Sequence, residues 1–183
     1  MTILLILSAY LLGSIPTSVW LGQWLYKKDI RDFGSGNAGA TNTFRTFGQK
    51  AGVVVLVVDA LKGFAAVKLI LLVSPMADNM GLAIALGCLS VAGHLFPVFA
   101  QFRGGKGIAT LLGVVIALHP AAALLAIAVF LASLFSFRIV SVSSMLSAFS
   151  FPLWLVFRFR GSEPILVYFS IAIVLLVLVT HQK

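Results

Sequence analysis

The longest uncharged stretch of the chain constrains its fold more than any other feature. From residue 108 to residue 137 the sequence contains no aspartate, glutamate, lysine or arginine, and almost every residue is apolar. A helix needs roughly 20 apolar residues to cross a bilayer, so this stretch is longer than one simple crossing. Other apolar runs cover residues 2–26, 51–73, 80–102, 139–157 and 164–180. These runs indicate a chain whose solvent is lipid.

Composition supports an all-α integral membrane fold. Hydrophobic residues make up 61% of the 183 positions and charged residues 10%, with a mean hydropathy of +1.11. A soluble domain of this length has more polar surface to cover. A membrane barrel would show short alternating segments in place of long runs. We interpret residues 1–183 as one polytopic domain whose first run is a retained span, kinked at Pro16.

The distribution of basic residues argues against a nucleic-acid partner, although the net charge is +8. Seven of the thirteen basic residues lie in two connections between apolar runs: Lys27, Lys28, Arg31, Arg45, Lys50, Arg103 and Lys106. The connection between the second and third runs contains only Asp78 as a charged residue. The positive-inside rule therefore predicts that the two basic connections are cytoplasmic and that the N-terminus is outside.

The number of spans depends on how the stretch 108–137 is divided. His119-Pro120 interrupts it near the middle, and proline favours a helix break there. Two helices give seven spans, whereas one kinked helix gives six. Loop charge slightly favours six, so the residues alone leave both alternatives open.

The first basic connection contains a glycine-rich loop from Phe33 to Arg45. Its small and polar residues are Gly34, Ser35, Gly36, Asn37, Gly39, Thr41 and Asn42. Free backbone N–H groups in such a loop can bind an anion, and Arg45 can grip a phosphate with two parallel donors. The alternative, an ordinary polar loop in which Asn42 caps a short helix, fits the loop equally well by itself.

The second connection runs from Gly93 to Thr110 and includes Gly104, Gly105, Lys106 and Gly107. Here the chain re-enters the membrane as a helix, whose N-terminus attracts anions, and Lys106 adds a full charge. His94 precedes this loop as an ionisable residue within the membrane. Asp59 and Lys62 are three residues apart on one helix, and we assign that pair a structural role. The acidic residues do not cluster with a histidine, so we expect neither a metal ion nor a cofactor.

Together these motifs resemble a known family. The segments GSGNAGATN with a following arginine, GHLFPVFAQFRGGKGIAT, SVSS, and a last span ending in histidine are similar to those of the bacterial acyl-phosphate:glycerol-3-phosphate acyltransferases, the PlsY family. The resemblance covers nearly the whole chain in family order. It implies seven transmembrane helices in the bacterial cytoplasmic (inner) membrane, with the N-terminus outside and the C-terminus cytoplasmic.

The resemblance also implies acyl transfer from acyl phosphate to the sn-1 hydroxyl of glycerol 3-phosphate, giving lysophosphatidic acid and phosphate. We assign catalysis to Ser35, Arg45, Lys106 and His94. The expected substrate-binding residues are Gly34, Gly36, Asn37, Gly39, Thr41, Asn42, Gly104, Gly105, Gly107, Thr110, Ser141, Ser143 and His181. The family carries an asparagine three residues after that last histidine, whereas this sequence ends at Lys183. Either the chain is cut short, with reduced activity, or the tail is dispensable.

We expect direct acyl transfer, because the basic face carries no serine–histidine–acid triad and no cysteine. By the resemblance, a substrate phosphate accepts the proton; His94 as general base is the alternative. The expected partners are acyl phosphate, glycerol 3-phosphate and membrane lipid, and the protein is expected to be a monomer. Two other classes of protein remain open: a transporter for phosphorylated metabolites and a purely structural membrane module.

Overall fold

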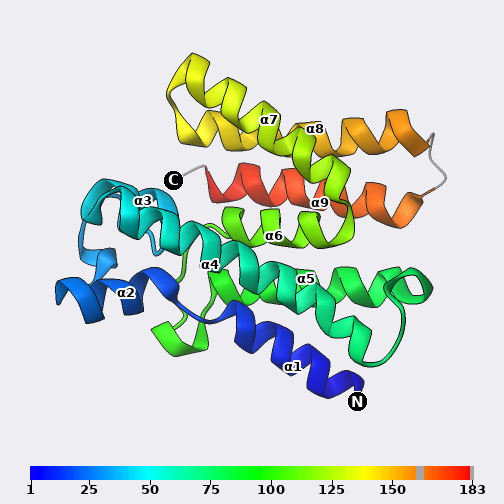
Figure 1. Ribbon diagram of the computed structural model, residues 1–183, viewed down its shortest axis with the longest axis horizontal. Helices are drawn as coiled ribbons and strands as arrows, with labels where there is room; N and C mark the ends of the chain where they lie inside the picture. Colours follow the sequence, from blue (N-terminus) through cyan, green and yellow to red (C-terminus); the bar gives the residue numbers. More distant parts are fainter. Residues whose placement is uncertain (160–162, 182–183) are drawn as a thin grey trace. The chain divides into compact units, whose positions relative to one another are not determined.

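The computed structural model describes residues 1–159 and 163–181, and within these ranges it contains helices and no strand (Figure 1). The α-helices in the described ranges are α1 (Thr2–Gly13), α2 (Thr17–Tyr26), α3 (Ala40–Phe47), α4 (Gln49–Lys68), α5 (Met80–Leu95), α6 (Ile108–Leu118), α7 (Pro120–Phe137), α8 (Val140–Phe159) and α9 (Pro164–Thr180). The 3-10 helices are η1 (Ile30–Asp32), η2 (Leu69–Leu72), η3 (Met76–Asn79) and η4 (Val98–Ala100). The predicted all-α fold is confirmed for the described residues.

The chain divides into two compact units, Met1–Leu118 and His119–Lys183. The boundary falls at the predicted interruption: α6 ends at Leu118 and α7 begins at Pro120. Pro120 occupies the first helical turn, where its missing N–H costs nothing. The Ala122 N–H donates to His119 Nδ1 at 3.1 Å, so His119 caps α7. The break is therefore encoded locally.

Three stretches are long and apolar enough to cross a membrane: Met80–Ala100, Pro120–Phe137 and Val140–Arg158. The pair α1 and α2 meets the same test only as one broken span, bent by 44°. The bend lies at the predicted Pro16 kink. Helices α6 and α9 are apolar but shorter, at 11 and 17 residues. The apolar helices therefore make the chain a membrane protein, with up to four clear spans in the described residues.

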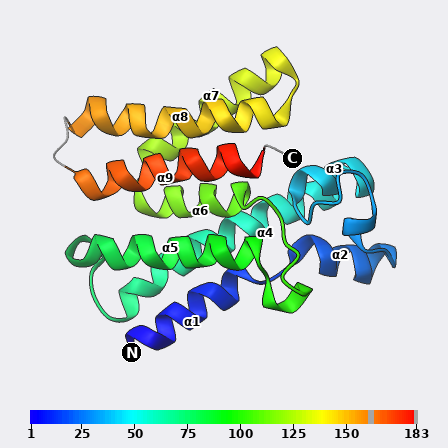
Figure 2. The same cartoon turned by 180° about the vertical axis from the view of Figure 1, so that it is seen from behind.

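In the Met1–Leu118 unit, α4 packs along α6 and α1 packs along α5 (Figures 1 and 2). Glycines allow the first of these contacts. A Cβ added at Gly63 would collide with the Thr110 carbonyl oxygen, and one added at Gly113 would collide with the Ala60 carbonyl oxygen. Close approach through small residues is how membrane helices gain packing contacts without a hydrophobic driving force.

The break between α1 and α2 rests on the Asp59–Lys62 pair of α4. Lys62 Nζ lies 2.9 Å from Asp59 Oδ1 and donates to the Ile15 carbonyl at 2.9 Å. The Thr17 hydroxyl donates to Asp59 Oδ1 at 3.0 Å. A broken helix exposes backbone groups that lipid cannot satisfy. Here the buried Lys62 bonds one of them, the Ile15 carbonyl, while Asp59 binds the Thr17 side chain at the start of α2. The structural role expected for Asp59 and Lys62 therefore fits their contacts.

The His119–Lys183 unit packs α8 against both α7 and α9. Phe151 of α8 meets Phe169 of α9 edge to face, with ring centroids 6.5 Å apart. Trp154 of α8 meets His119 edge to face at the same centroid distance. Aromatic contacts of this geometry add to the stabilisation that burial provides.

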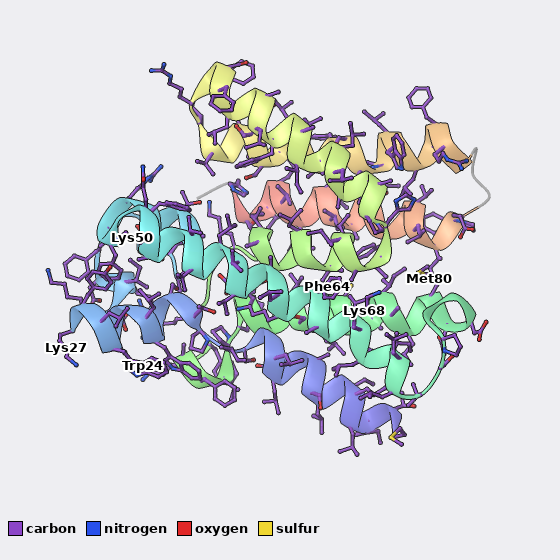
Figure 3. All side chains as sticks on the ribbon, in the orientation of Figure 1. Trp24, Lys27, Lys50, Phe64, Lys68 and Met80 are labelled. Atoms are coloured by element: carbon purple, nitrogen blue, oxygen red, sulfur yellow. The ribbon has the colours of Figure 1, made fainter. Side chains whose placement is uncertain are left out.

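The two ends of the Met1–Leu118 unit differ in charge. Lys27 and Lys50 lie at one end of this unit, and Met80 lies at the other (Figure 3). Trp24 lies at the same end as Lys27 and is 67% exposed. Tryptophan beside lysine is typical of the membrane–water interface. The helices of this unit therefore present one basic end, and the two glycine-rich loops belong to it.

We predict that Lys62→Met lowers the free energy of unfolding by about 3–5 kcal/mol, because it leaves Asp59 as a buried carboxylate without a cation. Thermal and denaturant unfolding in detergent measures this. Lys50→Met, at an exposed position of the same helix, is the control and should change little. Equal stability of the two variants would contradict the structural role of the pair.

Candidate active site

The first glycine-rich loop joins η1 to α3 over a small apolar cluster. Val19, Ile30 and Ala38 are buried in this cluster, and Phe47 packs against it. Tyr26 stacks on Phe47 with ring centroids 4.3 Å apart. The loop therefore packs against side chains from α2, η1 and α3, which support its backbone conformation.

Asn42 organises this loop from inside. Its side chain is only 1% exposed, and its amide oxygen accepts the Ser35 N–H at 3.0 Å. Its amide nitrogen lies within 3.1 Å of three carbonyl oxygens, those of Ile30, Phe33 and Asn37. The cap of α3 is Gly39, so the capping role considered for Asn42 is wrong. Every polar atom of the amide is occupied by the loop itself, which indicates a positioning role.

The loop conformation leaves Ser35 and Arg45 exposed. Gly34 has φ +60°, and a Cβ there would strike the Asn42 amide oxygen, so only glycine fits. Within the described residues, neither the Ser35 hydroxyl nor the Arg45 guanidinium has a hydrogen-bond partner. Gly36 is exposed nearby, as is Thr41 in the first turn of α3. The loop and the start of α3 thus present the hydroxyls of Ser35 and Thr41 and the guanidinium of Arg45 for a ligand.

The second loop, residues 96–107, returns to the end of α5. The Gly104 N–H donates to the Leu95 carbonyl and the Gly105 N–H to the His94 carbonyl, each at 3.2 Å. A Cβ at Gly104 would collide with both carbonyls. These two N–H groups are therefore taken by the protein in this conformation, and contact between either glycine and a substrate stays a prediction. The role of both glycines is to let the loop approach α5.

The two loops meet at Gly105. A Cβ added there would collide with His94 Nε2 and would lie 2.5 Å from the Ala38 carbonyl oxygen of the first loop. A second contact joins Arg31, before the first loop, to the Ala100 carbonyl of the second at 2.8 Å. The structure therefore brings together the first two sequence motifs, which are distant in the sequence.

Lys106 stands at this meeting point, directly before α6. Its side chain is half-buried, and within the described residues its ammonium has no hydrogen-bond acceptor or acidic partner. Burial without a counter-charge lowers the pKa of Lys106 below its ordinary value. The N–H groups of Lys106 and Gly107 also donate to no group in the described part of the chain. A desolvated cation beside a helix N-terminus is a site for an anion.

His94, at the end of α5, and Thr110, in the first turn of α6, are both buried. The His94 side chain is 6% exposed, with Nδ1 3.8 Å from Asp59 Oδ1 and Nε2 facing Gly105. Thr110 is fully buried against Gly63, and its hydroxyl lacks a hydrogen-bond partner among the described residues. In this conformation His94 lies against the second loop and Thr110 packs against α4. Direct contact with a ligand remains a prediction for each.

The third patch and the terminal histidine belong to the His119–Lys183 unit. Ser143 is buried and donates to the Ile139 carbonyl at 2.9 Å, whereas Ser141 is half-buried and no such bond engages its hydroxyl in the described residues. His181 Nδ1 lies 2.8 Å from the Val177 carbonyl oxygen, which requires a proton on Nδ1. Ser141 is therefore the better candidate of the two serines, and its place at the site stays a prediction, like that of His181.

Sequence reasoning counted Arg31 only as a basic residue and did not consider Asp29. In the structure the Arg31 guanidinium pairs with the Asp29 carboxylate, with Nη2 2.6 Å from Oδ2. The hydrogen bond from Arg31 lowers the pKa of Asp29, and the same bond raises the pKa of Arg31. The D-x-R spacing just before a glycine-rich loop was the signal that could have revealed the pair.

Comparison with known proteins places these loops in context. A family model described as glycerol-3-phosphate acyltransferase matches residues 3–183. The glycerol-3-phosphate acyltransferase of Streptococcus equi subsp. zooepidemicus (strain MGCS10565) is 42% identical over 187 residues, covering 98% of this chain and 85% of the relative. The glycerol-3-phosphate acyltransferase of Listeria monocytogenes serotype 4a (strain HCC23) is 49% identical over 146 residues, covering 80% of this chain and 73% of the relative.

Two solved structures are also similar. Both are crystal structures of PlsY (YgiH), an integral membrane glycerol 3-phosphate acyltransferase. The glycerol 3-phosphate form matches with a TM-score of 0.86 at 37% identity, covering 99% of this chain and 88% of that one. The lysophosphatidic acid form matches with a TM-score of 0.83 at 36% identity over the same shares.

We predict that binding of inorganic phosphate weakens as pH rises through the lowered pKa of Lys106, because only the charged ammonium attracts the anion. The loss should begin below the pH at which an ordinary lysine titrates. Lys106→Arg should retain binding to higher pH, since arginine stays charged, and Lys106→Met should bind weakly throughout. Calorimetric titration across pH 7.5 to about 10.5 measures this, with Lys50→Arg as control. Identical profiles for wild type and Lys106→Arg would contradict the assignment.

Proposed function

Because the chain belongs to the glycerol-3-phosphate acyltransferase family, we propose that it transfers an acyl group from acyl phosphate to the sn-1 hydroxyl of glycerol 3-phosphate. The products are lysophosphatidic acid and inorganic phosphate. The observation that carries this proposal is Lys106, a half-buried ammonium without an acceptor in the described residues, at the contact between two glycine-rich loops. Both substrates carry a phosphate that can satisfy it.

The reaction is a direct displacement at the acyl carbon. The hydroxyl oxygen of glycerol 3-phosphate forms a bond to the acyl-phosphate carbonyl carbon, and the bond from that carbon to the bridging oxygen breaks. Phosphate leaves with the electron pair. Arg45 and Lys106 hold the two phosphates, and their positive charge stabilises the departing one most. Holding both substrates in one place supplies much of the remaining rate enhancement.

The proton of the attacking hydroxyl passes to a substrate phosphate. His94 is the alternative base, but its ring is 6% exposed, with Nε2 facing Gly105 and Nδ1 facing Asp59. A general base must come within about 3 Å of the proton it removes. An acyl phosphate is already activated, so a strong protein base is not required. We assign His94 to positioning of the second loop.

The remaining site residues divide between contact and positioning. We propose that Ser35, Asn37 and the exposed first-loop glycines contact a phosphate, while Asn42 holds their loop in shape. Ser141 and His181 are further proposed substrate-binding residues. The alternative transporter is not favoured, because Arg45 and Lys106 lie in loops at a basic end and not along a path at mid-membrane depth.

An apolar groove beside the second loop suits the acyl chain. It has a volume of about 510 Å³ and is lined by Ser8, Leu11, Leu12, Ile15, Trp20 and Phe99. Phe99 belongs to η4 of the second loop, and the other residues come from α1, α2 and the break between them. An acyl tail can therefore enter sideways from membrane lipid while its phosphate reaches Lys106.

For the topology we propose seven crossings in the bacterial cytoplasmic membrane, with the N-terminus outside and the C-terminus cytoplasmic. Support comes from the separate helices α6 and α7 and from the basic loops between α2 and α4 and between α5 and α6. The two units form one functional domain, and the protein acts as a monomer.

We predict that the purified protein converts palmitoyl phosphate and labelled glycerol 3-phosphate to lysophosphatidic acid in detergent, without a membrane gradient. Activity should persist in EDTA, because the charge on both phosphates is met by Arg45 and Lys106. Arg45→Gln and Lys106→Gln should each lower turnover by at least about 10²-fold, with Lys50→Gln as control. Uptake of unchanged glycerol 3-phosphate into sealed vesicles would favour the transporter, and abolition by EDTA with rescue by magnesium would contradict metal-free transfer.

A further inference from the structure

The Asp29–Arg31 pair connects the two loops and is used by no step of the reaction. Arg31 lies in η1, just before the first loop. Its guanidinium donates through Nη1 to the carbonyl oxygen of Ala100 at 2.8 Å. Ala100 lies in η4 of the second loop. Both side chains of the pair are largely buried, at 12% exposure for Arg31 and 20% for Asp29. Ion pairs on the protein surface are solvated and contribute little, whereas this pair is largely shielded from water and bonds a second segment of the chain.

The geometry of the pair locks the guanidinium plane. Nε lies 3.0 Å from Asp29 Oδ1, and Nη2 lies 2.6 Å from Asp29 Oδ2, so the carboxylate is gripped by two parallel bonds. The Arg31 backbone N–H donates to the same carboxylate at 2.9 Å. With Nε and Nη2 held by Asp29, Nη1 can point only toward the second loop. Lysine has no planar fork and cannot reproduce this arrangement.

The acceptor, Ala100, precedes the most unusual backbone in the second loop. Gln101 and Phe102 both have φ +58°, a left-handed conformation that residues with side chains rarely adopt. Such backbone persists only where surrounding contacts hold it in place. The Phe102 N–H donates to the Pro97 carbonyl at 2.9 Å and the Arg103 N–H to Ala100 at 3.2 Å. This left-handed turn redirects the chain toward Gly104 and Lys106.

We propose that Arg31 is a positioning residue, which fixes the left-handed turn of the second loop against the first loop and thereby sets where Lys106 stands relative to Arg45. The proposal rests on the proposed function, because the clamp it positions is the acyltransferase site. Asp29 orients the guanidinium, Arg31 bonds the loop, and neither touches a substrate. The spacing between Arg45 and Lys106 thus depends on Arg31.

The kinetic test uses Arg31→Lys, Arg31→Gln and the charge swap Asp29→Arg with Arg31→Asp. The swap can keep an ion pair but places a carboxylate where the Ala100 carbonyl needs a donor. We expect all three to lower kcat/KM for glycerol 3-phosphate by about 10²-fold, because a misplaced clamp loses orientation. The control, Lys50→Gln, removes one charge at the same end of the unit and should be unaffected. Full activity of Arg31→Gln, or recovery in the charge swap, would overturn the proposal.

A structural readout separates this proposal from the proposed function. Spin labels at Phe33 and Phe102, both exposed, are introduced in a Cys88→Ala background. We expect a narrow distance distribution between the loops with Arg31 and a broad one in Arg31→Gln. Equal distributions would reject the positioning role even if the wild type is active. If the wild type is inactive but its distance distribution is still narrower than that of Arg31→Gln, the acyltransferase function is rejected and the link between the loops stands.

Discussion

The candidate site depends on the return of the second loop to the end of α5. Two hydrogen bonds make that return, from Gly104 to Leu95 and from Gly105 to His94. A Cβ at Gly104 would collide with the carbonyls of His94 and Leu95, and one at Gly105 would collide with the His94 ring and the Ala38 carbonyl oxygen. The return uses the last carbonyls of α5, which a helix end leaves unpaired, and it sets Lys106 directly before α6. The same two glycines therefore complete one helix and position the start of the next.

The low polarity of the membrane explains how polar groups beneath the site are arranged. The break between α1 and α2 would leave backbone groups without partners in lipid. Lys62 donates to the Ile15 backbone carbonyl, Asp59 accepts from the Thr17 hydroxyl, and Asp59 also faces His94 across 3.8 Å. His94 in turn lies against Gly105. A series of neighbouring residues thus connects the break between α1 and α2 with the second loop. The same residues therefore pack the helices and position the site.

Local chemistry allowed some features to be predicted from the sequence. Pro16 and His119-Pro120 mark real helix breaks, because proline acts on its own neighbourhood, and Asp59 and Lys62 pair because helical spacing places them together. The sequence indicates that the glycine-rich loops are unlike ordinary connections, but it does not indicate which groups their N–H groups bond. Whether Gly104 donates to a ligand or to Leu95 depends on a tertiary contact that no local pattern encodes. The same holds for Asn42 and for Arg31, whose partner Ala100 is distant in sequence.

The central claim is that Arg45 and Lys106, from two loops, form one clamp that holds the phosphates of both substrates together. A double-mutant cycle on kcat/KM, measured with both substrates for Arg45→Gln, Lys106→Gln and the double variant, tests this claim most directly. If both cations serve one clamp, the losses should be non-additive, with a coupling energy of about 0.5–3 kcal/mol. Losses that add to within about 0.3–0.5 kcal/mol would mean that the two residues act independently, and the shared phosphate site would be contradicted.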